Sequence, residues 1–562
     1  MAPAANNVEP MVSATYVRPA GFAAAGDTIP FLLDNTYHLF HLASPLNTVY
    51  HPPRVRCSWI RQRSKDLVHW TRDTKPVISP GAQDSDPDCS GAWTGSVVLG
   101  RDGNMHIFYT GYNLPEGGGR QVILHAVSSD REGTEFEKPL QPIQLDSASA
   151  NSYAQFEATD FRDPYVFFNE EENCYWMVVA TRLAAESNPG APYWTRGCLA
   201  LLTSADLDVW MVQREPLYAP NNILCPECPE MFTLGNGKWY IVYSRFSAPD
   251  AGTLYVVSDS GPRGPYRSPR DGTGGRLDGR RWYAAKSCPK RGDPSKRIFF
   301  AWVHDRHQDA DISGKWLWGG SLMQPRELRA NANGSLVLAP NDSFLGSLRD
   351  VQLSGETLPA EVTLGTVGVQ SVHRLSVVDL PADDTIQVLS FTMHGVPDMS
   401  SGNKSGCHNV HPDAKSFGLL LNFDDDLRGY KLSFAPVGGG SAGLFSVALV
   451  TDQPPLDDFW AMLTKHTDIP NLVDGPELVR HGAVHLDSEE PLRLVRNQDV
   501  IELFVDGKVI TYRLPAREQK VNETDGVNRH AMVKVYPVGF FVEDGEVSFK
   551  DIRLSQVTIT DK

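Results

Sequence analysis

Three acidic residues in the first half of the chain have the surroundings of catalytic carboxylates. Asp27 stands in the segment Gly-Asp-Thr-Ile-Pro, Asp163 in Arg-Asp-Pro, and Glu227 in Glu-Cys-Pro-Glu. Each acid lies directly before, or at the start of, an apolar segment that predicts a β-strand. Strands that line one funnel would bring the three carboxylates together. Converging carboxylates fit the hydrolysis of a glycosidic bond, in which one acts as nucleophile or base and another as proton donor.

The elements that must position these acids are nearly all strands. Runs rich in aromatic and β-branched residues begin about 60 to 70 residues apart. They are Tyr37–Leu42, Met105–Thr110, Tyr175–Ala180, Lys238–Tyr243 and Arg297–Trp302. The pattern Ser-x-Asp-Leu-x-x-Trp at Ser64–Trp70 returns at Ser204–Trp210, which predicts a repeated turn with a core tryptophan. This period is typical of the four-stranded blades of a β-propeller.

The pattern of the chain changes after Pro325–Leu328, where polar residues interrupt the regular strands. Alternating strands return beyond Glu361, for example at Ser416–Asn422 and Val538–Val542. We therefore expect an all-β protein of two domains. A five-bladed β-propeller is expected over residues 1–345, followed by a β-sandwich over residues 346–562.

The composition excludes several classes of protein. With 52 basic and 68 acidic residues the net charge is −16, which argues against nucleic acid or an anionic membrane as partner. No apolar run is long enough to cross a bilayer as a helix. The first ten residues lack the features of a secretory leader, which favours a cytoplasmic location, or a secreted protein whose leader has been removed.

The sequence gives no indication of a cofactor. Cys225 and Cys228 form a single Cys-x-x-Cys pair, and neither a second pair nor a suitable histidine spacing completes a zinc site. The glycine runs at Gly117–Gly119 and Gly438–Gly440 lack the strand-to-helix context of a phosphate loop. We expect no metal and no organic cofactor.

Six motifs, taken in order, make the first half of the chain resemble glycoside hydrolase family 32, the β-fructosidases that include invertases, inulinases and levanases. The motifs are Trp59 with Ser64–Trp70, Trp93–Ser96, Arg162–Pro164, Glu227–Pro229, Asp278–Gly279 with Tyr283–Ala285, and Trp318–Gly319 with Pro325–Leu328. The fold of that family, a five-bladed propeller followed by a sandwich, agrees with the layout predicted above.

The resemblance implies a role for each acid. Asp27 would be the nucleophile, Glu227 the general acid/base, and Asp163 the residue that stabilises the developing charge through the sugar hydroxyls. A retaining enzyme of this kind forms a covalent fructosyl-enzyme. The side chains expected around the substrate are Trp59, Trp93, Ser96, Arg162, Cys228, Tyr283 and Trp318.

The segment around the nucleophile departs from the common family pattern Trp-Met-Asn-Asp-Pro-Asn-Gly, because this chain has Ala24-Ala-Gly-Asp-Thr-Ile-Pro30. The form Gly-Asp-x-x-Pro resembles a divergent branch that includes levan fructotransferases. The other nearby acid, Asp34, is followed by Asn35 and is better explained as a hairpin turn.

The sequence thus predicts a retaining β-fructofuranosidase or fructosyltransferase that acts on sucrose, inulin or levan. Two alternatives stay open: a related propeller glycosidase for another furanoside, such as an arabinofuranoside, and a carbohydrate-binding protein without turnover. Whether water or a sugar accepts the fructosyl group depends on loops such as Asn113–Arg120, Glu186–Arg196 and His304–Lys315. The second domain would brace the first, extend the cleft or form a homodimer interface.

Overall fold

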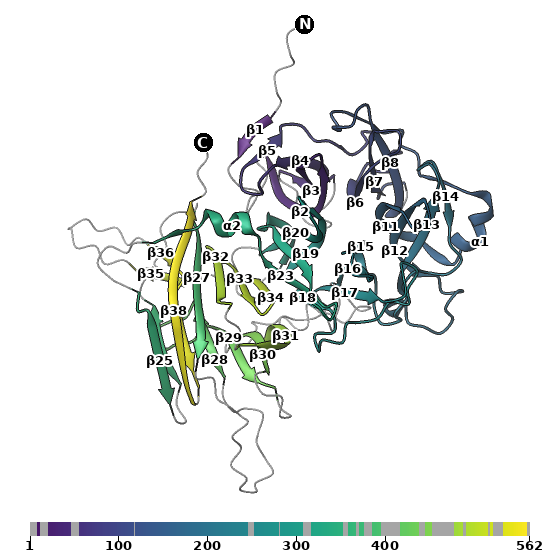
Figure 1. The fold of residues 1–562 in the computed structure, drawn as a ribbon. Helices are drawn as coiled ribbons and strands as arrows, with labels where there is room; N and C mark the ends of the chain where they lie inside the picture. The colour runs from purple at the N-terminus through teal and green to yellow at the C-terminus, as the bar shows by residue number, and fades with distance from the viewer. Residues whose placement is uncertain are drawn as a thin grey trace.

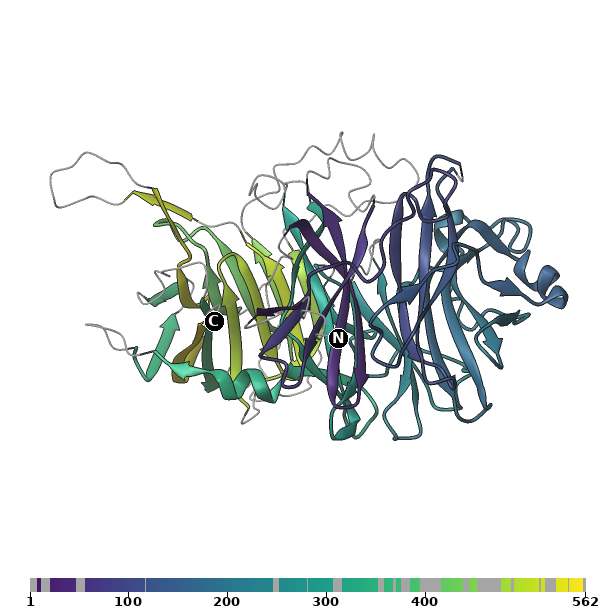
Figure 2. The ribbon, with the colours of Figure 1, turned by 90° about the horizontal axis from the view of Figure 1, so that it is seen from above.

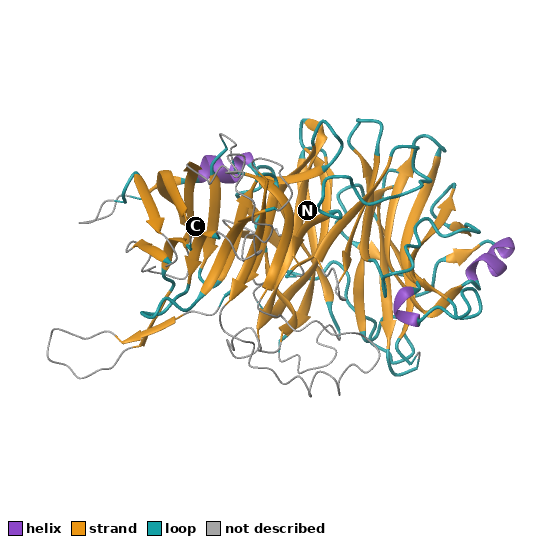
Figure 3. Cartoon of the chain, turned by 90° about the horizontal axis from the view of Figure 1, so that it is seen from below, coloured by secondary structure: helices purple, strands orange, loops and turns teal. Residues whose placement is uncertain are grey.

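The chain folds almost entirely into β-strands (Figures 1 and 3). The computed structural model describes residues 8–11, 21–46, 56–116, 118–245, 252–279, 281–306, 316–351, 358–366, 370–375, 385–394, 416–437, 444–451, 477–486, 490–514, 517–520, 532–543 and 545–558. The α-helices in these ranges are α1 (Ala150–Tyr153) and α2 (Asp342–Ser347). Within the described residues, no helix is long and apolar enough to span a membrane. The predicted all-β class is confirmed.

The first half consists of five groups of antiparallel strands. The first group contains β2 (Phe22–Leu33), β3 (Thr36–Pro45), β4 (Ser58–Ser64) and β5 (Trp70–Asp73), and the second contains β6 (Gly91–Leu99), β7 (Met105–Asn113), β8 (Arg120–Ser128) and β9 (Phe136–Glu137). The third group contains β11 (Phe156–Asn169), β12 (Cys174–Leu183), β13 (Gly197–Ser204) and β14 (Val209–Val212), and the fourth contains β15 (Glu227–Thr233), β16 (Trp239–Arg245), β17 (Gly252–Ser258) and β18 (Arg276–Gly279). The fifth group contains β19 (Trp282–Lys290), β20 (Asp293–Arg306), β21 (Trp316–Leu322), β22 (Arg326–Ala330) and β23 (Leu336–Pro340). Two short strands extend them, β1 (Val8–Met11) beside β5 and β10 (Gln144–Leu145) beside β14.

The strand runs predicted from the sequence form the second strand of each group, namely β3, β7, β12, β16 and β20. The predicted repeat forms the same turn twice, because Ser64 and Ser204 each accept the N–H of the leucine three residues later, at 2.8 and 3.0 Å. The tryptophan that ends each repeat is buried. Asp34 and Asn35 have φ of +44° and +68° and form the predicted turn between β2 and β3.

The first strands of the five groups surround a common centre in Figure 1. Each contacts the next, β2 with β6, β6 with β11, β11 with β15, β15 with β19, and β19 with β2. The first and fifth groups also share one sheet, because Ala25 of β2 pairs with Gly320 of β21. The later strands of each group lie farther from the centre.

The second half contains two larger sheets that pack face to face. One sheet contains β24 (Arg349–Asp350), β25 (Glu361–Thr366), β27 (Thr385–His394), β32 (Leu492–Asn497), β33 (Val500–Val505), β34 (Lys508–Arg513) and β38 (Gly545–Thr558). The other contains β26 (Ser371–Leu375), β28 (Phe417–Leu421), β29 (Tyr430–Pro436), β30 (Leu444–Thr451), β31 (Glu477–His485) and β37 (Val538–Val542). Phe391 of β27 meets Phe540 of β37 with ring centroids 5.2 Å apart, in the core between the sheets. A hairpin of β35 (Arg517–Lys520) and β36 (Met532–Val535) stands outside both.

The two halves lie side by side (Figure 2) and share a buried charged cluster. Arg326 of β22 donates to Asp278 of β18 and to Glu502 of β33, both at 2.6 Å. All three side chains are fully buried. The guanidinium carbon of Arg326 also lies 4.1 Å from the ring centroid of Trp282, at the start of β19. The interface therefore connects a strand of the second half to the first strand of the fifth group.

Candidate active site

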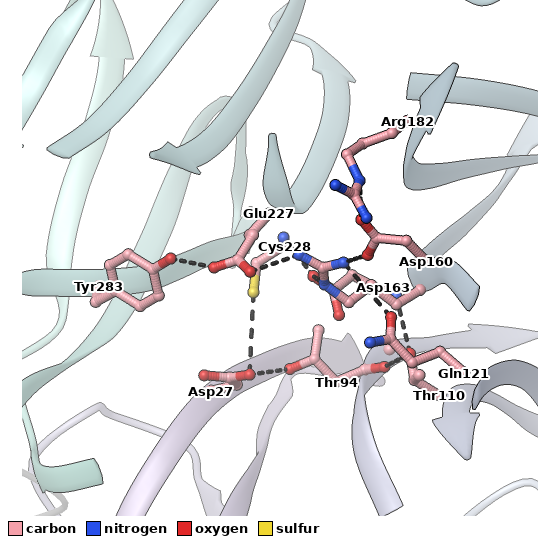
Figure 4. Close-up of polar contacts among 12 residues, drawn as sticks. Asp27, Thr94, Thr110, Gln121, Asp160, Asp163, Arg182, Glu227, Cys228 and Tyr283 are labelled. Atoms are coloured by element: carbon pink, nitrogen blue, oxygen red, sulfur yellow. Dashed lines mark hydrogen bonds and ion pairs between the residues drawn. The ribbon is translucent and has the colours of Figure 1, made fainter. Parts of the chain in front are cut away.

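The three acids predicted from the sequence lie together (Figure 4). Asp27 belongs to β2, Asp163 to β11 and Glu227 to β15. Cys228 joins them: its N–H donates to Asp163 Oδ2 at 2.8 Å, and its Sγ lies 3.9 Å from Asp27 Oδ2. Three groups that are far apart in the sequence thus contribute one acid each.

All five first strands are irregular at the level of these acids. Register shifts interrupt their pairing with the second strands, and such irregularities turn side chains out of the regular alternation. The shifts lie between Gly26 and Thr28, Trp93 and Gly95, Arg162 and Tyr165, Glu227 and Glu230, and Tyr283 and Lys286. The interruptions present Asp27, Asp163 and Glu227 to the centre instead of leaving them in a regular ladder.

Three of the interruptions contain a residue in the left-handed region. The angle φ is +57° at Asp163, +50° at Cys228 and +48° at Ala284. This conformation costs a residue other than glycine about 1–3 kcal/mol. Pro164 and Pro229 follow the first two residues and have no N–H to contribute to a ladder. The dipeptides Asp-Pro and Cys-Pro therefore mark the points at which β11 and β15 leave regular pairing.

Asp27 is held by neutral donors. Its side chain is buried, Thr94 Oγ1 donates to Oδ2 at 2.7 Å, and the indole Nε1 of Trp302 donates to Oδ1 at 3.1 Å. Burial, assisted by the charges of Asp163 and Asp27, raises the pKa of the Cys228 thiol well above its usual value. The thiol therefore keeps its proton and is a third, weak donor to Asp27 Oδ2. These contacts fix the plane of the carboxylate.

Glu227 is held by a cation and a phenol. Arg162 Nη2 donates to Oε1 at 2.6 Å, and the hydroxyl of Tyr283 donates to Oε2. Burial and the charge of Glu227 raise the pKa of Tyr283, so the phenol stays protonated and remains a donor. The Glu227 side chain keeps 13% of its surface exposed, which leaves it accessible to a ligand.

Arg162 is the centre of a larger ionic network. Its Nε lies 3.8 Å from Asp163 Oδ2, and its Nη1 pairs with Asp160. Asp160 is held in turn by Arg182, whose Nε lies 2.6 Å from Oδ2. The network fixes the guanidinium plane of Arg162 between Asp163 and Glu227, in the position to contact both acids.

Two of the predicted aromatic residues lie close to Asp27. Trp318 packs against Trp302 with ring centroids 5.5 Å apart. A side chain at Gly26 would collide with the Trp318 ring, which explains why glycine precedes Asp27. Trp93, one residue before Thr94, stacks on Tyr112 with centroids 4.0 Å apart and is mostly buried.

The prediction that Trp59 and Ser96 contact the substrate requires correction. Trp59 is fully buried in the core of the first two groups, and its indole N–H donates to Trp93 O at 3.0 Å. Ser96 is also buried, and its hydroxyl accepts the N–H of Val166 at 2.8 Å. The Trp59 ring packs in the core and the Ser96 hydroxyl links two strands, so both side chains support the strands that carry the site.

Several residues of the site were not predicted from the sequence. Thr94 and Trp302 hold Asp27, and Thr110 Oγ1 accepts the N–H of Asp163 at 2.8 Å. Asp160 and Arg182 complete the network around Arg162. Thr94 lies inside the predicted motif Trp93–Ser96, so its position in that motif could have indicated it as a site residue. Trp302 lies in a strand buried on both faces, where alternation does not distinguish a donor from a core residue.

A cavity of about 480 Å³ lies farther along the same first strands. Residues 29–32, 96–98, 165–171, 231–233 and 286–289 contribute to its lining, and each range follows the site residues of its own strand. The five first strands therefore run in one direction, and on each strand the site residues come before the residues that line the cavity.

The comparison with protein families gives one match that covers more than half of the chain. The model described as "Glycosyl hydrolases family 32 N-terminal domain" matches residues 28–340. A beta-fructofuranosidase of Arabidopsis thaliana, insoluble isoenzyme CWINV3, is 25% identical over 71% of this chain and 67% of its own length. A levanase of Bacillus sp. (strain L7) is also 25% identical, over 61% of this chain and 37% of the levanase.

Solved structures of low sequence identity have the same fold. Fructan 1-exohydrolase IIa of Cichorium intybus, in complex with 1-kestose, superposes with a TM-score of 0.63 at 20% identity, over 98% of both chains. The exo-inulinase of Aspergillus awamori gives a TM-score of 0.60 at 18% identity, again over 98% of both chains. Together with the extent of the family match, these findings establish that the chain belongs to glycosyl hydrolase family 32.

Proposed function

We propose that this protein is a retaining glycoside hydrolase that cleaves β-fructofuranosidic bonds of sucrose or of fructans such as inulin and levan. The observation that carries the proposal is the convergence of Asp27, Asp163 and Glu227, from three strands, around Cys228. Two carboxylates beside one sugar suffice for nucleophile and acid/base, and a third can bind hydroxyls. The fructosidase names of the relatives support the choice of sugar.

In the first step, an Asp27 oxygen attacks the anomeric carbon while the bond from that carbon to the glycosidic oxygen breaks. Glu227 gives its proton to the departing oxygen, so the leaving sugar departs as a neutral alcohol. The product is an ester between Asp27 and the fructosyl group. Thr94 and Trp302 hold the Asp27 carboxylate in one plane, which reduces the entropy lost on reaching the transition state.

In the second step, Glu227 takes a proton from water, and the resulting oxygen nucleophile attacks the anomeric carbon. The ester bond breaks, Asp27 is released as a carboxylate, and fructose leaves with its original anomeric configuration. The donors from Arg162 and Tyr283 stabilise the charge that appears on Glu227 between the two steps. A sugar hydroxyl in the place of water would give transfer instead of hydrolysis.

Asp163 is proposed to bind two sugar hydroxyls and to stabilise the positive charge that develops on the ring. Arg162, with Nε 3.8 Å from Asp163 Oδ2, lies beside this acid and can contact the same hydroxyls. Trp318, Trp93 and Tyr283 are proposed as the apolar walls of the fructosyl subsite, with Cys228 at its floor. Trp318 occupies the space above Gly26, where the common family pattern has asparagine.

The five groups of strands are proposed to be the blades of a five-bladed β-propeller, over residues 1–345. The ring of contacts among the first strands and the pair Ala25–Gly320 support this assignment. The two packed sheets of residues 346–562 are proposed to form a β-sandwich domain. Its role would be to brace the propeller, which the buried cluster around Arg326 supports.

Product analysis tests the proposal. The purified protein is incubated separately with sucrose, inulin and levan, and the products are separated by chromatography. Free fructose is the expected product, and the best substrate identifies the linkage. Cyclic difructose or longer oligosaccharides would instead identify a fructosyltransferase. No product from any of the three would contradict the proposal.

A further inference from the structure

The loop between β12 and β13 stands at the mouth of the site. Phe156, at the beginning of β11, pairs with Leu183 at the end of β12, so the chain leaves β12 on the side where the acids lie. The following loop carries a short 3-10 helix, Tyr193–Thr195, and returns at Gly197, opposite Arg182. The loop contains the predicted loop Glu186–Arg196, whereas residues 307–315 of the third predicted loop lie outside the described residues.

Tyr193 is connected to Glu227 through charged side chains. The guanidinium carbon of Arg182 lies 5.4 Å from the Tyr193 ring centroid, and its Nε lies 2.6 Å from Asp160. Asp160 pairs with Arg162, which donates to Glu227 at 2.6 Å. The 3-10 helix thus approaches the site from beyond Arg162, next to the acid that is proposed to protonate the leaving group.

The Trp194 ring is held in position but open to solvent. It is 41% exposed, and Tyr193 meets it edge-on with centroids 5.6 Å apart and planes at 81°. The backbone beneath it is fixed, since Thr195 donates to Pro192 O through both N–H and Oγ1, at 2.9 and 2.8 Å. A large apolar ring that its neighbours hold in place is therefore open to solvent, on the loop that leaves β12 on the side of the acids.

Corresponding loops of two other groups also expose large apolar side chains. Leu46, directly after β3, is 60% exposed, and Leu114, directly after β7, is 47% exposed. Residues 246–251, between β16 and β17, and residues 307–315, within β20 to β21, lie outside the described residues. Two further loops that leave second strands on this side therefore each expose one apolar side chain.

We propose that Trp194, backed by Tyr193, is an outer subsite that stacks on a sugar ring on the leaving-group side of the scissile bond. The inference rests on the proposed function. Sugar rings have apolar C–H faces that match an indole plane. Sucrose has one ring on the leaving-group side, whereas a fructan has several. The preferred substrate is therefore a fructan chain, and sucrose is a poorer one.

The test compares kcat/KM for a four-ring fructo-oligosaccharide with kcat/KM for sucrose, in the wild type and in Trp194→Ala and Trp194→Phe. The oligosaccharide-to-sucrose ratio is expected to fall about tenfold in Trp194→Ala, mainly through KM, and to recover in Trp194→Phe. Met211→Ala is the matched control, because Met211 is 50% exposed on β14 and lies outside the site. Its ratio is expected to equal that of the wild type.

Two outcomes would overturn the inference and are distinguishable from each other. An active wild type with an unchanged ratio in Trp194→Ala would show that Trp194 binds no leaving-group ring. Equal losses on both substrates, with a lowered melting temperature, would show that Trp194 supports the fold and does not bind a sugar. A wild type that releases no fructose from either sugar would instead refute the proposed function, and the inference with it.

Discussion

Asp27 and Glu227 are surrounded by donors of different charge. Threonine, tryptophan and thiol groups donate to Asp27 and orient its carboxylate. Glu227 accepts from a guanidinium and a phenol, which stabilise the charge that it acquires when it gives up its proton. A nucleophile needs its charge throughout the first step, whereas an acid/base acquires its charge during that step. The two environments therefore agree with the two proposed roles.

Asp27→Asn tests the nucleophile. The amide cannot form the fructosyl ester, so turnover is expected to fall by at least about 10⁴-fold, while Tm changes by no more than about 3 °C. Asp34→Asn is the matched control, because Asp34 lies in the exposed turn after β2 and pairs with Arg131 at 2.9 Å. Fructose release and thermal unfolding are measured for both variants. More than a tenth of wild-type activity in Asp27→Asn would remove the assignment.

Glu227→Gln tests the acid/base through the leaving group. A natural fructoside needs a proton on its leaving oxygen, so its kcat/KM is expected to fall about 10²–10⁴-fold. A nitrophenyl fructoside departs without that proton, and its first step is expected to remain fast. Stopped-flow measurement should then give a burst of nitrophenol followed by slow hydrolysis of the ester. Equal losses on both substrates would assign Glu227 to binding.

At the residue scale, the sequence proposed three acids that the structure brings together, but it did not indicate all of their neighbours. Asp27, Asp163 and Glu227 were predicted because each stands in a distinctive local motif. Trp59 and Trp302 illustrate the limit, since both belong to strands with two buried faces. Whether such a ring packs in a core or donates to a carboxylate depends on the angle between neighbouring sheets, which local alternation does not encode.

The strands that carry the acids are interrupted by a shift in pairing register next to the site residues. A regular strand alternates its side chains between two faces, so it cannot direct neighbouring residues such as Arg162 and Asp163 to the same centre. The register shifts in β2, β6, β11, β15 and β19 remove that restriction. The sequence predicted the strands from their composition, but among these shifts only the two that contain proline had a local signal.

Ala284→Val tests the register shift in β19. Ala284 has φ of +48° and is fully buried, so valine adds both crowding and a branched side chain in the left-handed region. Ala285→Val is the matched control, because Ala285 is also buried but does not have a positive φ. Urea unfolding is expected to give an additional loss of about 1–3 kcal/mol for Ala284→Val. Equal losses would show that the conformation at 284 carries no cost.

At the scale of the whole molecule, the two halves meet at a buried cation, Arg326, which pairs with one carboxylate from each half. Arg326 and Asp278 come from the first half, and Glu502 comes from the second. Thr511 of β34 completes the cluster, with its N–H donating to Asp278 at 3.0 Å. The sequence predicts two all-β units that divide near residue 345, and that division stays a prediction. It could not predict this cluster, because no local pattern relates positions so far apart.

Glu502→Ala tests the coupling between the halves. Removal of Glu502 deprives the buried Arg326 of the carboxylate that the second half supplies and leaves Asp278 as its remaining ion-pair partner in the cluster, which is expected to cost about 3 kcal/mol. Asp424→Ala is the matched control, because Asp424 pairs at 3.3 Å with Arg428, whose side chain is 63% exposed, and such pairs contribute about 1 kcal/mol or less. Urea unfolding midpoints are compared for both variants. Similar midpoints would show that the cluster is not needed to hold the halves together.

Because the five first strands share one direction, the acids lie toward one end of these strands and the cavity lies toward the opposite end. The cavity of about 480 Å³ near the strand ends has walls from all five groups, yet it lies beyond the residues that would touch a sugar. An environment-sensitive dye attached there would report on the interior of the ring during turnover without competing with substrate. The same position offers a place for engineered ligands that stiffen or loosen the ring from below. The cavity therefore offers a position, remote from the acids, at which an introduced ligand would alter activity without occupying the substrate site.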